Sequence, residues 1–417
     1  MKEKMSLQAY KGTRDFYPAE CAQLIKFFDL CRESASLFAF EEYMGPLLES
    51  FDLYAAKTGQ EIVEKQLYHF LDRGERKVAI RPEMTPTMAR MIAAKFTEIK
   101  QPIRWFSIPN LYRYERPQRG RLREHWQFNA DLLGGDKEKA DIEILCLLAH
   151  FFQNLGALNK IKIRVNNRKI VQALLNQLGT DEENSLALMK LIDAKEKLSA
   201  EAFDQKLKII LPEHQQQKLL DEYFQGSFES ETLREDLEKN ISVIQKNYPG
   251  LDIFYDPIIM RGLDYYTGMV FEVFDSSPEN NRALAGGGRY DHLLNIFGKN
   301  SLSGVGFGMG DVGILNFIET HQLFKETNKK SVYFITLKDE SNFVLQQKLA
   351  TALRKEKISA LLSLKTASLS KQIAIARAKN ASDIVVFEEN EKITVKNLET
   401  SQEKTFFVDE FIKNIQK

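Results

Sequence analysis

The sequence predicts an α+β fold in two parts, a large N-terminal part and a small C-terminal domain. Three observations support this prediction. Apolar and polar residues alternate in several short segments before position 135 and after position 250, which is typical of strands joined as hairpins. A helical insertion is expected at about 173–250, which is rich in Lys, Glu, Leu and Gln. Beyond position 330, short apolar segments alternate with helical patterns, which predicts a mainly parallel α/β sheet.

The N-terminal elements follow in order. Helical periodicity covers 19–39, and YMGPLLES then predicts a strand at an edge or bend, because Pro46 cannot donate to a β-ladder. A hairpin, QLYHFLD and KVAI, turns at RGER, and a helix begins after Thr85 and Pro86. RWFSIPNLYRYE and EHWQFNADLLG alternate like two strands of another hairpin. A helix at 137–155 and the strand IKIRVNN precede the insertion.

Strand patterns return after the insertion at LDIFYDPIIMRG and YYTGMVFEVF. The glycine segment AGGGRYD follows, and SGVGFGMG predicts a strand running into a helix with Asp311 as its N-cap. KETNKK at 325–330 is the expected linker. In the C-terminal domain, SVYFIT, ISALLSL and SDIVVFE are predicted strands, separated by helices at 341–356 and 369–380. The domains are therefore placed at 1–325 and 330–417.

Composition limits the classes of function. The chain has 417 residues, and its 58 Lys and Arg balance 58 Asp and Glu, so any nucleic-acid site must be a local feature. Three widely spaced cysteines, Cys21, Cys31 and Cys146, fit a reducing cytoplasm and argue against a metal cluster, and the histidines show no metal-ligand spacing. No segment approaches the roughly 18 apolar residues of a membrane span. We expect a cytoplasmic protein without a membrane partner or a protein-bound metal.

The most informative segment is LYRYERPQRGRLREHWQFNAD at 111–131. It places five arginines within eleven residues, at positions 113, 116, 119, 121 and 123. A hairpin with this turn delivers several guanidiniums to one place, and arginine suits bidentate binding of phosphate. The alternative is a solvated basic turn. Glu115 weakens that alternative, because it shares a strand face with Arg113 and could orient its guanidinium.

Four further motifs each have an ordinary structural alternative. RPEMT at 81–85 places Glu83 where it could bind an ammonium group, or is a surface turn. RGLDYYTG supplies paired tyrosines for a small-ligand pocket, or a half-buried strand. The glycines of AGGGRYD allow close approach to a ligand, or form a turn. SGVGFGMGDVG contains a formal dinucleotide fingerprint, which we reject because the surrounding order is not β-α-β.

Together these motifs resemble the class II aminoacyl-tRNA synthetases, and most closely the histidyl-tRNA synthetases. KGTRDFYP resembles the opening segment, YMGP motif 1, LYRYERPQRGRLREHWQF motif 2 and SGVGFGMG motif 3. RGLDYYTG and AGGGRYD resemble the two histidine-specific signatures. The resemblance implies a mostly antiparallel catalytic sheet flanked by helices, an insertion near the tRNA acceptor arm, and an anticodon-binding domain at 330–417.

The resemblance also implies an activity. A histidine–tRNA ligase joins L-histidine to ATP as histidyl-adenylate and then transfers the histidyl group to the 3′ end of tRNA(His). Mg²⁺ would bridge the ATP phosphates. Motif 1 implies a homodimer. No editing domain is expected, because a pocket that hydrogen-bonds both imidazole nitrogens already rejects apolar competitors.

Residue roles are carried over from the matching motifs. Arg113 and Arg261 are the expected catalytic cations at the α-phosphate, and Arg261 also meets the histidine carboxylate. The expected histidine-binding residues are Glu83, Thr85, Gln127, Asp131, Arg261, Tyr265 and Tyr266. Those for ATP are Arg113, Glu115, Arg121, Gly308 and Gly310. Those for tRNA are Arg116, Gln118, Arg119 and Arg123.

Two positions depart from the family pattern. Motif 3 normally ends in an arginine for the ATP γ-phosphate, and Gly313 occupies that position. Either Arg121, Arg123 or the helix N-terminus replaces that arginine, or ATP binds weakly. Asp131 is one methylene shorter than the usual Glu. These departures leave open a non-catalytic paralogue, such as the regulatory subunit of ATP phosphoribosyltransferase. A synthetase for another amino acid is disfavoured by RGLDYYTG.

Overall fold

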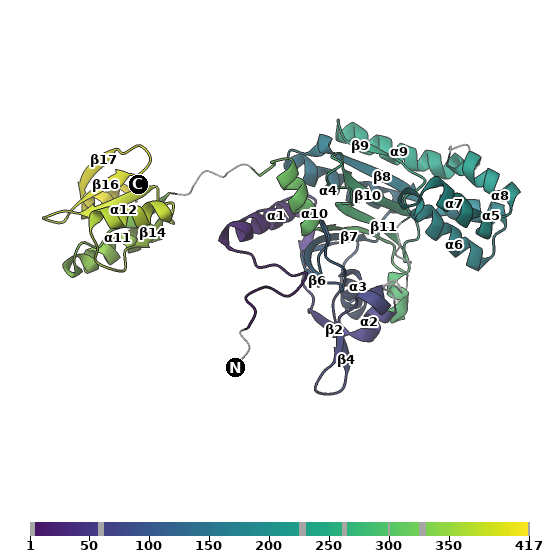
Figure 1. Cartoon of the computed structure of the whole chain (residues 1–417), viewed down its shortest axis with the longest axis horizontal. Coiled ribbons are helices and arrows are strands. Elements are labelled where there is room, and N and C mark those ends of the chain that lie inside the picture. Colours follow the sequence, from purple (N-terminus) through teal and green to yellow (C-terminus); the bar gives the residue numbers. More distant parts are fainter. Residues whose placement is uncertain are drawn as a thin grey trace. The chain divides into compact units, whose positions relative to one another are not determined.

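The structure is a computed structural model that describes residues 5–56, 62–224, 231–260, 265–298, 301–324 and 331–415. The chain divides into two compact units, Met1–Phe324 and Lys325–Lys417 (Figure 1). The predicted linker at 325–330 lies outside the described residues, and so does Arg261. No helix in the described ranges is long and apolar enough to cross a membrane.

The first unit is built on a large sheet with strand order β1-β5-β7-β12-β11-β10-β8-β9, and β6 pairs with β7 beside it. β1 with β5 and β8 with β9 are parallel, and the other neighbours are antiparallel. The mostly antiparallel sheet is therefore confirmed. The strands are β1 Glu41–Glu42, β5 Ile103–Ser107, β6 Asn110–Tyr112, β7 Glu124–Leu133, β8 Ile161–Asn167, β9 Asp252–Tyr255, β10 Met269–Asp275, β11 Ala285–Tyr290 and β12 Gly304–Gly310.

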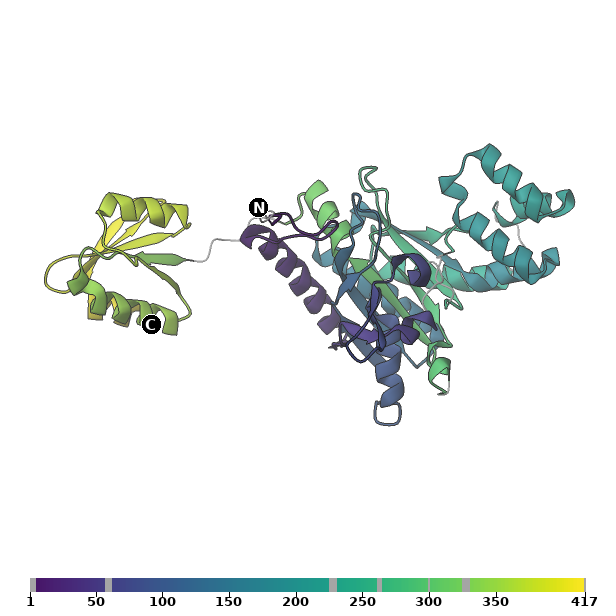
Figure 2. The same ribbon diagram turned by 60° about the horizontal axis from the view of Figure 1, so that its bottom comes forward.

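One face of this sheet is covered by α1 Pro18–Leu37, α4 Lys137–Asn154 and α10 Asp311–Thr320 (Figure 2). Phe128, Ala130 and Leu132 of β7 are buried in the core formed with these helices. Because side chains alternate along a strand, residues 127, 129 and 131 point to the opposite face. That face carries the site described below.

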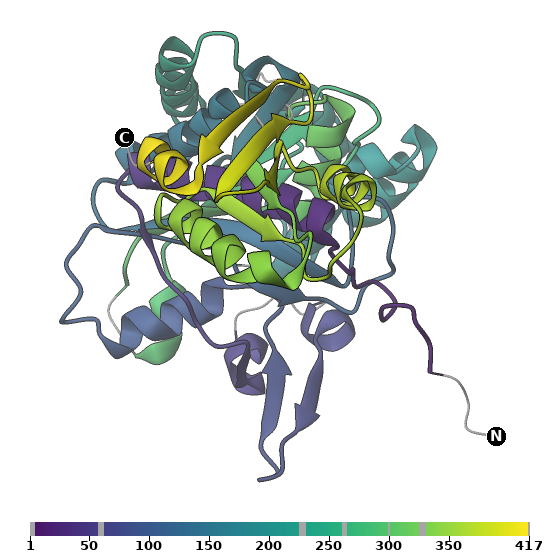
Figure 3. The same cartoon turned by 90° about the vertical axis from the view of Figure 1, so that its left-hand side faces the viewer.

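A smaller sheet of order β2-β4-β3 lies near the N-terminus, and the β3–β4 hairpin projects from the body of the first unit (Figure 3). Its elements are β2 Leu48–Ser50, α2 Phe51–Ala55, β3 His69–Leu71, β4 Lys77–Ile80 and α3 Thr85–Ala94. The expected hairpin and the helix after Thr85 are confirmed. YMGPLLES is not one strand, because Pro46 lies in the segment between β1 and β2 and interrupts the pairing.

The region predicted as a helical insertion contains α5 Arg168–Leu178, α6 Glu182–Asp193, α7 Ala200–Ile210, α8 Glu213–Lys218 and α9 Glu231–Asn247. The helices α5 to α8 gather at one end of the large sheet (Figure 1). α5 begins directly after β8, with Asn167 as its N-cap accepting from the Lys169 amide. The insertion therefore starts a few residues earlier than the composition change indicates.

The second unit has a sheet of order β14-β13-β15-β16-β17 with helices on both faces (Figure 2). The predicted β-α-β-α-β order is present, and β13 is parallel to both β14 and β15. The sequence interpretation missed the antiparallel hairpin β16–β17, so the sheet is mixed rather than mainly parallel. The elements are β13 Val332–Ile335, α11 Phe343–Lys355, β14 Ser359–Leu362, α12 Leu369–Ala378, β15 Asp383–Phe387, β16 Lys392–Asn397, β17 Glu403–Phe407 and α13 Val408–Ile415.

Candidate active site

The open face of the sheet carries a row of polar side chains on β7. Gln127, Asn129 and Asp131 lie opposite glycines of β12, in the pairs Gln127–Gly310, Asn129–Gly308 and Asp131–Gly306. A Cβ added at Gly308 would fall 2.7 Å from the Gln127 Cδ. The glycines thus give the polar side chains room above the sheet. AGGGRYD serves the same surface as a buried strand, β11, and is not a turn.

A cavity of about 1160 Å³ opens over this row. Every described residue predicted to bind histidine lines it, namely Glu83, Thr85, Gln127, Asp131, Tyr265 and Tyr266. The Tyr265 hydroxyl donates to the Glu83 Oε2 at 3.4 Å, so the RPEMT and RGLDYYTG motifs meet in space although they are far apart in sequence. The insertion supplies one wall through Leu186, Met189 and Lys190 of α6.

Asp131 is a strongly perturbed acid in this cavity. Its side chain is buried, and the Tyr290 hydroxyl donates to its Oδ1 at 2.5 Å. Burial raises the pKa of Asp131 to about 7, and the hydrogen bond from Tyr290 opposes that shift. A carboxylate held in this way can accept a hydrogen bond from a ligand N–H, and it is the buried polar group that a ligand would satisfy.

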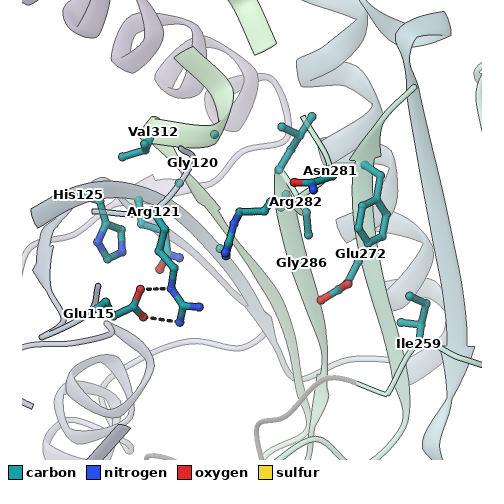
Figure 4. A pocket seen from close by; sticks show the side chains of 18 of the residues that line it. Glu115, Gly120, Arg121, His125, Ile259, Glu272, Asn281, Arg282, Gly286 and Val312 are labelled. Carbon is teal, nitrogen blue, oxygen red and sulfur yellow. Dashed lines mark hydrogen bonds and ion pairs between the residues drawn. The ribbon is translucent and has the colours of Figure 1, made fainter. Parts of the chain in front are cut away.

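A second cavity, of about 1020 Å³, adjoins the first (Figure 4). Arg113, Arg121, Gln127 and Gly308 line both cavities. Arg113 donates from its Nε to the Pro82 carbonyl at 2.9 Å, which fixes the arginine beside Glu83 at the junction. Glu115 and Gly310, also predicted for ATP, line the second cavity alone.

Glu115 is buried, and its carboxylate accepts from both the Nε and the Nη2 of Arg121. The sequence indicates Arg113 as the partner of Glu115, but β6 ends at Tyr112, so the strand alternation does not continue to Glu115. Figure 4 shows the pair at the edge of the cavity, with His125 beside it. Burial, together with the nearby Arg113, Arg14 and Arg121, lowers the pKa of His125 to about 3.

The arginines of the loop between β6 and β7 differ in their exposure to solvent. Arg116, Gln118 and Arg119 are exposed, and residues 118 and 121 exchange backbone hydrogen bonds of 2.9 Å across a turn. Gly120 takes a φ of +75° in this turn, a conformation that favours glycine.

Arg123 does not fit its predicted role in tRNA binding. Its side chain is buried, and the guanidinium stacks over the Tyr114 ring at 4.0 Å from the centroid. It also donates to the Glu115 carbonyl at 3.0 Å and to the Tyr10 hydroxyl at 3.1 Å. Arg123 therefore holds the loop in place from within.

Asp311 is not the N-cap of α10. Gly310 occupies that position, and the buried Asp311 carboxylate accepts instead from Arg14 at 2.6 Å and from the Trp126 amide at 2.9 Å. The aspartate thus ties the start of α10 to β7 and to the N-terminal segment.

Sequence reasoning missed four lining residues. Tyr290 and His125 were inside quoted motifs, but local spacing does not reveal that they face the cavities. Arg168 donates to the Tyr266 carbonyl at 3.0 Å and comes from the first turn of α5. Arg282 lies in the segment before β11, and its side chain projects into the second cavity (Figure 4). Long-range sheet pairing brings all four to the site.

A mostly antiparallel sheet whose glycine-rich strands support two adjoining cavities, one over a row of polar side chains and one lined by arginines, is the architecture of a class II aminoacyl-tRNA synthetase. A family model described as histidyl-tRNA synthetase matches residues 12–312, and a second family model, described as anticodon binding domain, matches residues 331–417. A histidine–tRNA ligase of Leptospira biflexa is 39% identical over 433 aligned residues, covering 100% of this chain and 99% of the relative. The chain belongs to the histidyl-tRNA synthetase family.

Solved structures agree on the fold. The histidyl-tRNA synthetase of Nostoc sp. PCC 7120 superimposes with a TM-score of 0.81 at 19% identity, covering 99% of both chains. A Bacillus halodurans protein described as an ATP phosphoribosyltransferase regulatory subunit/histidyl-tRNA synthetase gives a TM-score of 0.75 at 20% identity, covering 92% of this chain and 98% of that one. At these identities the likeness concerns the fold alone.

Proposed function

We propose that the two adjoining cavities bind histidine and ATP, and that together they form the site at which a histidine–tRNA ligase charges its tRNA. The chain activates L-histidine with ATP and transfers the histidyl group to tRNA(His). The observation that supports this site assignment is the junction of the cavities. Arg113 lies there between the polar row of β7 and the arginine-lined cavity, where a carboxylate from one side would meet a phosphate from the other.

We call the first cavity, over the polar row of β7, the amino-acid cavity. Glu83, Thr85 and Gln127 bind the ammonium group of histidine there, and the Tyr265 hydroxyl orients Glu83. Asp131 accepts from one imidazole N–H, and Tyr266 lies against the ring. Apolar amino acids could not donate an N–H to the buried Asp131, which disfavours them by about 1–3 kcal/mol relative to histidine.

In the second cavity, which we call the nucleotide cavity, Arg113 binds the α-phosphate, and the Glu115–Arg121 pair with Gly308 and Gly310 contributes to binding ATP. The histidine carboxylate oxygen forms a bond to the α-phosphorus while the bond to the bridging oxygen breaks, and pyrophosphate leaves. Neutralising and aligning the phosphates is sufficient for this step, so no protein nucleophile is required. Arg261 shares this task in the proposal, on the strength of the sequence motif alone.

The second step transfers the histidyl group. A terminal ribose hydroxyl of tRNA attacks the carbonyl carbon of the adenylate, and AMP leaves with the electron pair of the broken C–O bond. The exposed Arg116, Gln118 and Arg119 of the β6–β7 loop contact the acceptor stem. Residues 1–325 form the catalytic domain, and 330–417 recognise the anticodon.

Mg²⁺ enters with ATP in this proposal. Among the described residues, no group of three or more His, Cys, Asp or Glu side chains could hold a metal ion by itself. Mg²⁺ in nucleotide sites is commonly held by one or two carboxylates plus substrate phosphates, and Glu272 of β10 lines the nucleotide cavity. The bound ion would neutralise charge on the phosphates.

A homodimer is supported by exposed apolar side chains around motif 1 and the small sheet. Met44 is 84% exposed, Leu71 66% and Leu48 47%. Leu48 and Leu71 lie on strands that flank β4 in the same sheet. Exposed large apolar side chains in one region of the chain are residues that a subunit interface can cover.

The regulatory-subunit alternative is less supported. The polar row and the arginine cavity are intact, and the C-terminal unit matches the anticodon-binding family. Histidine-dependent exchange of pyrophosphate into ATP tests the assignment, with each of the other amino acids as control. We expect exchange with histidine alone. Exchange with no amino acid would contradict the catalytic assignment. Exchange with a different amino acid would show that histidine is not the substrate.

A further inference from the structure

We propose that Arg282 binds the outer phosphates of ATP and so supplies the cation that α10 lacks at Gly313. This inference rests on the proposed ATP site and deepens it. Arg282 lies between β10 and β11, and its half-buried side chain extends into the nucleotide cavity (Figure 4). Within the described part of the chain, no hydrogen bond or ion pair holds its guanidinium, so all its donors can serve a ligand.

The backbone that carries Arg282 is anchored at its base. The buried Asn280 donates to the Asp275 Oδ2 at 2.7 Å and to the Thr320 Oγ1 at 3.2 Å. Arg119 donates to the Asn280 Oδ1 at 3.4 Å, which joins this segment to the β6–β7 loop. The position of Arg282 is therefore set by contacts outside the ligand site.

The stem of Arg282 lies against the turn of that loop. A Cβ added at Gly120 would fall 3.3 Å from the Arg282 Cδ. Both residues line the nucleotide cavity, so the guanidinium reaches past the turn into the space where the triphosphate would lie. Arg113 lines both cavities, whereas Arg282 lines the nucleotide cavity alone. This separation assigns Arg113 to the α-phosphate and Arg282 to the phosphates beyond it.

The two arginines expected to replace the motif 3 arginine already have partners within the protein. Arg121 is bound by both oxygens of Glu115, and Arg123 is buried against Tyr114. Gly313 lines the same cavity and carries no charge, and the nearest atom to a Cβ added there would be the Leu284 Cδ2 at 3.8 Å. A Cβ at position 313 would make only ordinary van der Waals contact, and Gly313→Arg therefore gives the proposal a relocation test.

The test compares Arg282→Met, which keeps the aliphatic stem and removes the charge, with Arg282→Lys and with Arg73→Met. Arg73 is an exposed arginine in the β3–β4 turn, outside both cavities, and serves as the matched control. In histidine-dependent pyrophosphate exchange, we expect Arg282→Met to raise KM for ATP about 10- to 100-fold, the loss typical of one charge-assisted hydrogen bond. KM for histidine should stay unchanged. Arg282→Lys should lose less, and Gly313→Arg added to Arg282→Met should recover part of the loss.

Equilibrium dialysis with ATP and with AMP separates phosphate binding from a structural role. Arg282→Met should weaken ATP and leave AMP unchanged, whereas a displaced loop would weaken both. Equal weakening of both nucleotides, or an unchanged affinity for ATP, would overturn the proposal. Dialysis requires no turnover, so it still decides the role of Arg282 if the wild-type chain shows no exchange. Absence of exchange in the wild-type chain would contradict the proposed function instead.

Discussion

Replacing Asp131 by Asn should stabilise the protein while damaging its function. Asp131 is buried above the sheet, and burial raises its pKa from 3.8 to about 7. The folded state therefore holds the Asp131 proton more tightly than the unfolded state does. Stability contributed by the neutral form is complete below the unfolded pKa and is lost as the pH rises toward the folded pKa of about 7. Above that pH Asp131 is ionised in both the folded and the unfolded state, and the loss of stability is complete.

The shift sets the size of the effect. A rise from 3.8 to about 7 corresponds to at most about 4 kcal/mol of unfolding free energy at pH 8. Asn cannot ionise, but its buried NH₂ group lacks an acceptor, at a loss of about 1–3 kcal/mol. The net gain at pH 8 should be about 1–3 kcal/mol, and it should shrink steadily as the pH falls from 7 to 4.

Chemical denaturation of both proteins between pH 4 and pH 8 measures this difference, and pyrophosphate exchange measures the loss of function. Asp141→Asn is the matched control. Burial also raises the pKa of Asp141, to about 6, but its Oδ1 accepts from Arg289 at 2.6 Å. Asn keeps an acceptor for Arg289 but loses the charge, and Asp291 stays at 3.7 Å from the same guanidinium, so Asp141→Asn should gain less stability at pH 8 than Asp131→Asn does.

Two results would refute the reasoning about Asp131. One is a stability gain that does not change with pH, which would show that ionisation of Asp131 is irrelevant. The other is full exchange activity with histidine in Asp131→Asn, which would remove this carboxylate from imidazole recognition.

Three further predictions concern the loop, the second unit and the interface. Arg123→Ala should lower the unfolding free energy by about 1–3 kcal/mol through lost stacking on Tyr114 and lost hydrogen bonds. An equally stable variant with weakened tRNA binding would show instead that Arg123 binds tRNA. Removing 325–417 should leave pyrophosphate exchange intact and reduce tRNA charging, and equal charging would contradict the anticodon assignment. Leu71→Glu should convert a dimer to monomers in sedimentation, because Leu71 is 66% exposed and a charge there opposes apolar contact; an intact dimer would place the interface elsewhere.

Local sequence determined most of the elements. The alternation on either side of the arginine-rich turn predicted the hairpin into β7, but its first arm, expected as one strand, is divided into β5 and β6. The helix expected after Thr85 and Pro86 is α3, which begins at Thr85. These features depend on residues close together in the chain, where periodicity and capping act directly. The resemblance of several motifs to one family then supplied the antiparallel sheet, which periodicity alone did not specify.

Only the tertiary structure decided what each charged residue does. Five arginines in one segment look alike in sequence, yet Arg121 binds Glu115, Arg123 is buried, and Arg116 and Arg119 are exposed. Arg282 was not singled out by any local pattern, and it reaches the site because β10 and β11 pair in the same sheet as β7. The role of a guanidinium depends on its distant partners and its exposure, and both are set by strand register and packing rather than by neighbours in the chain.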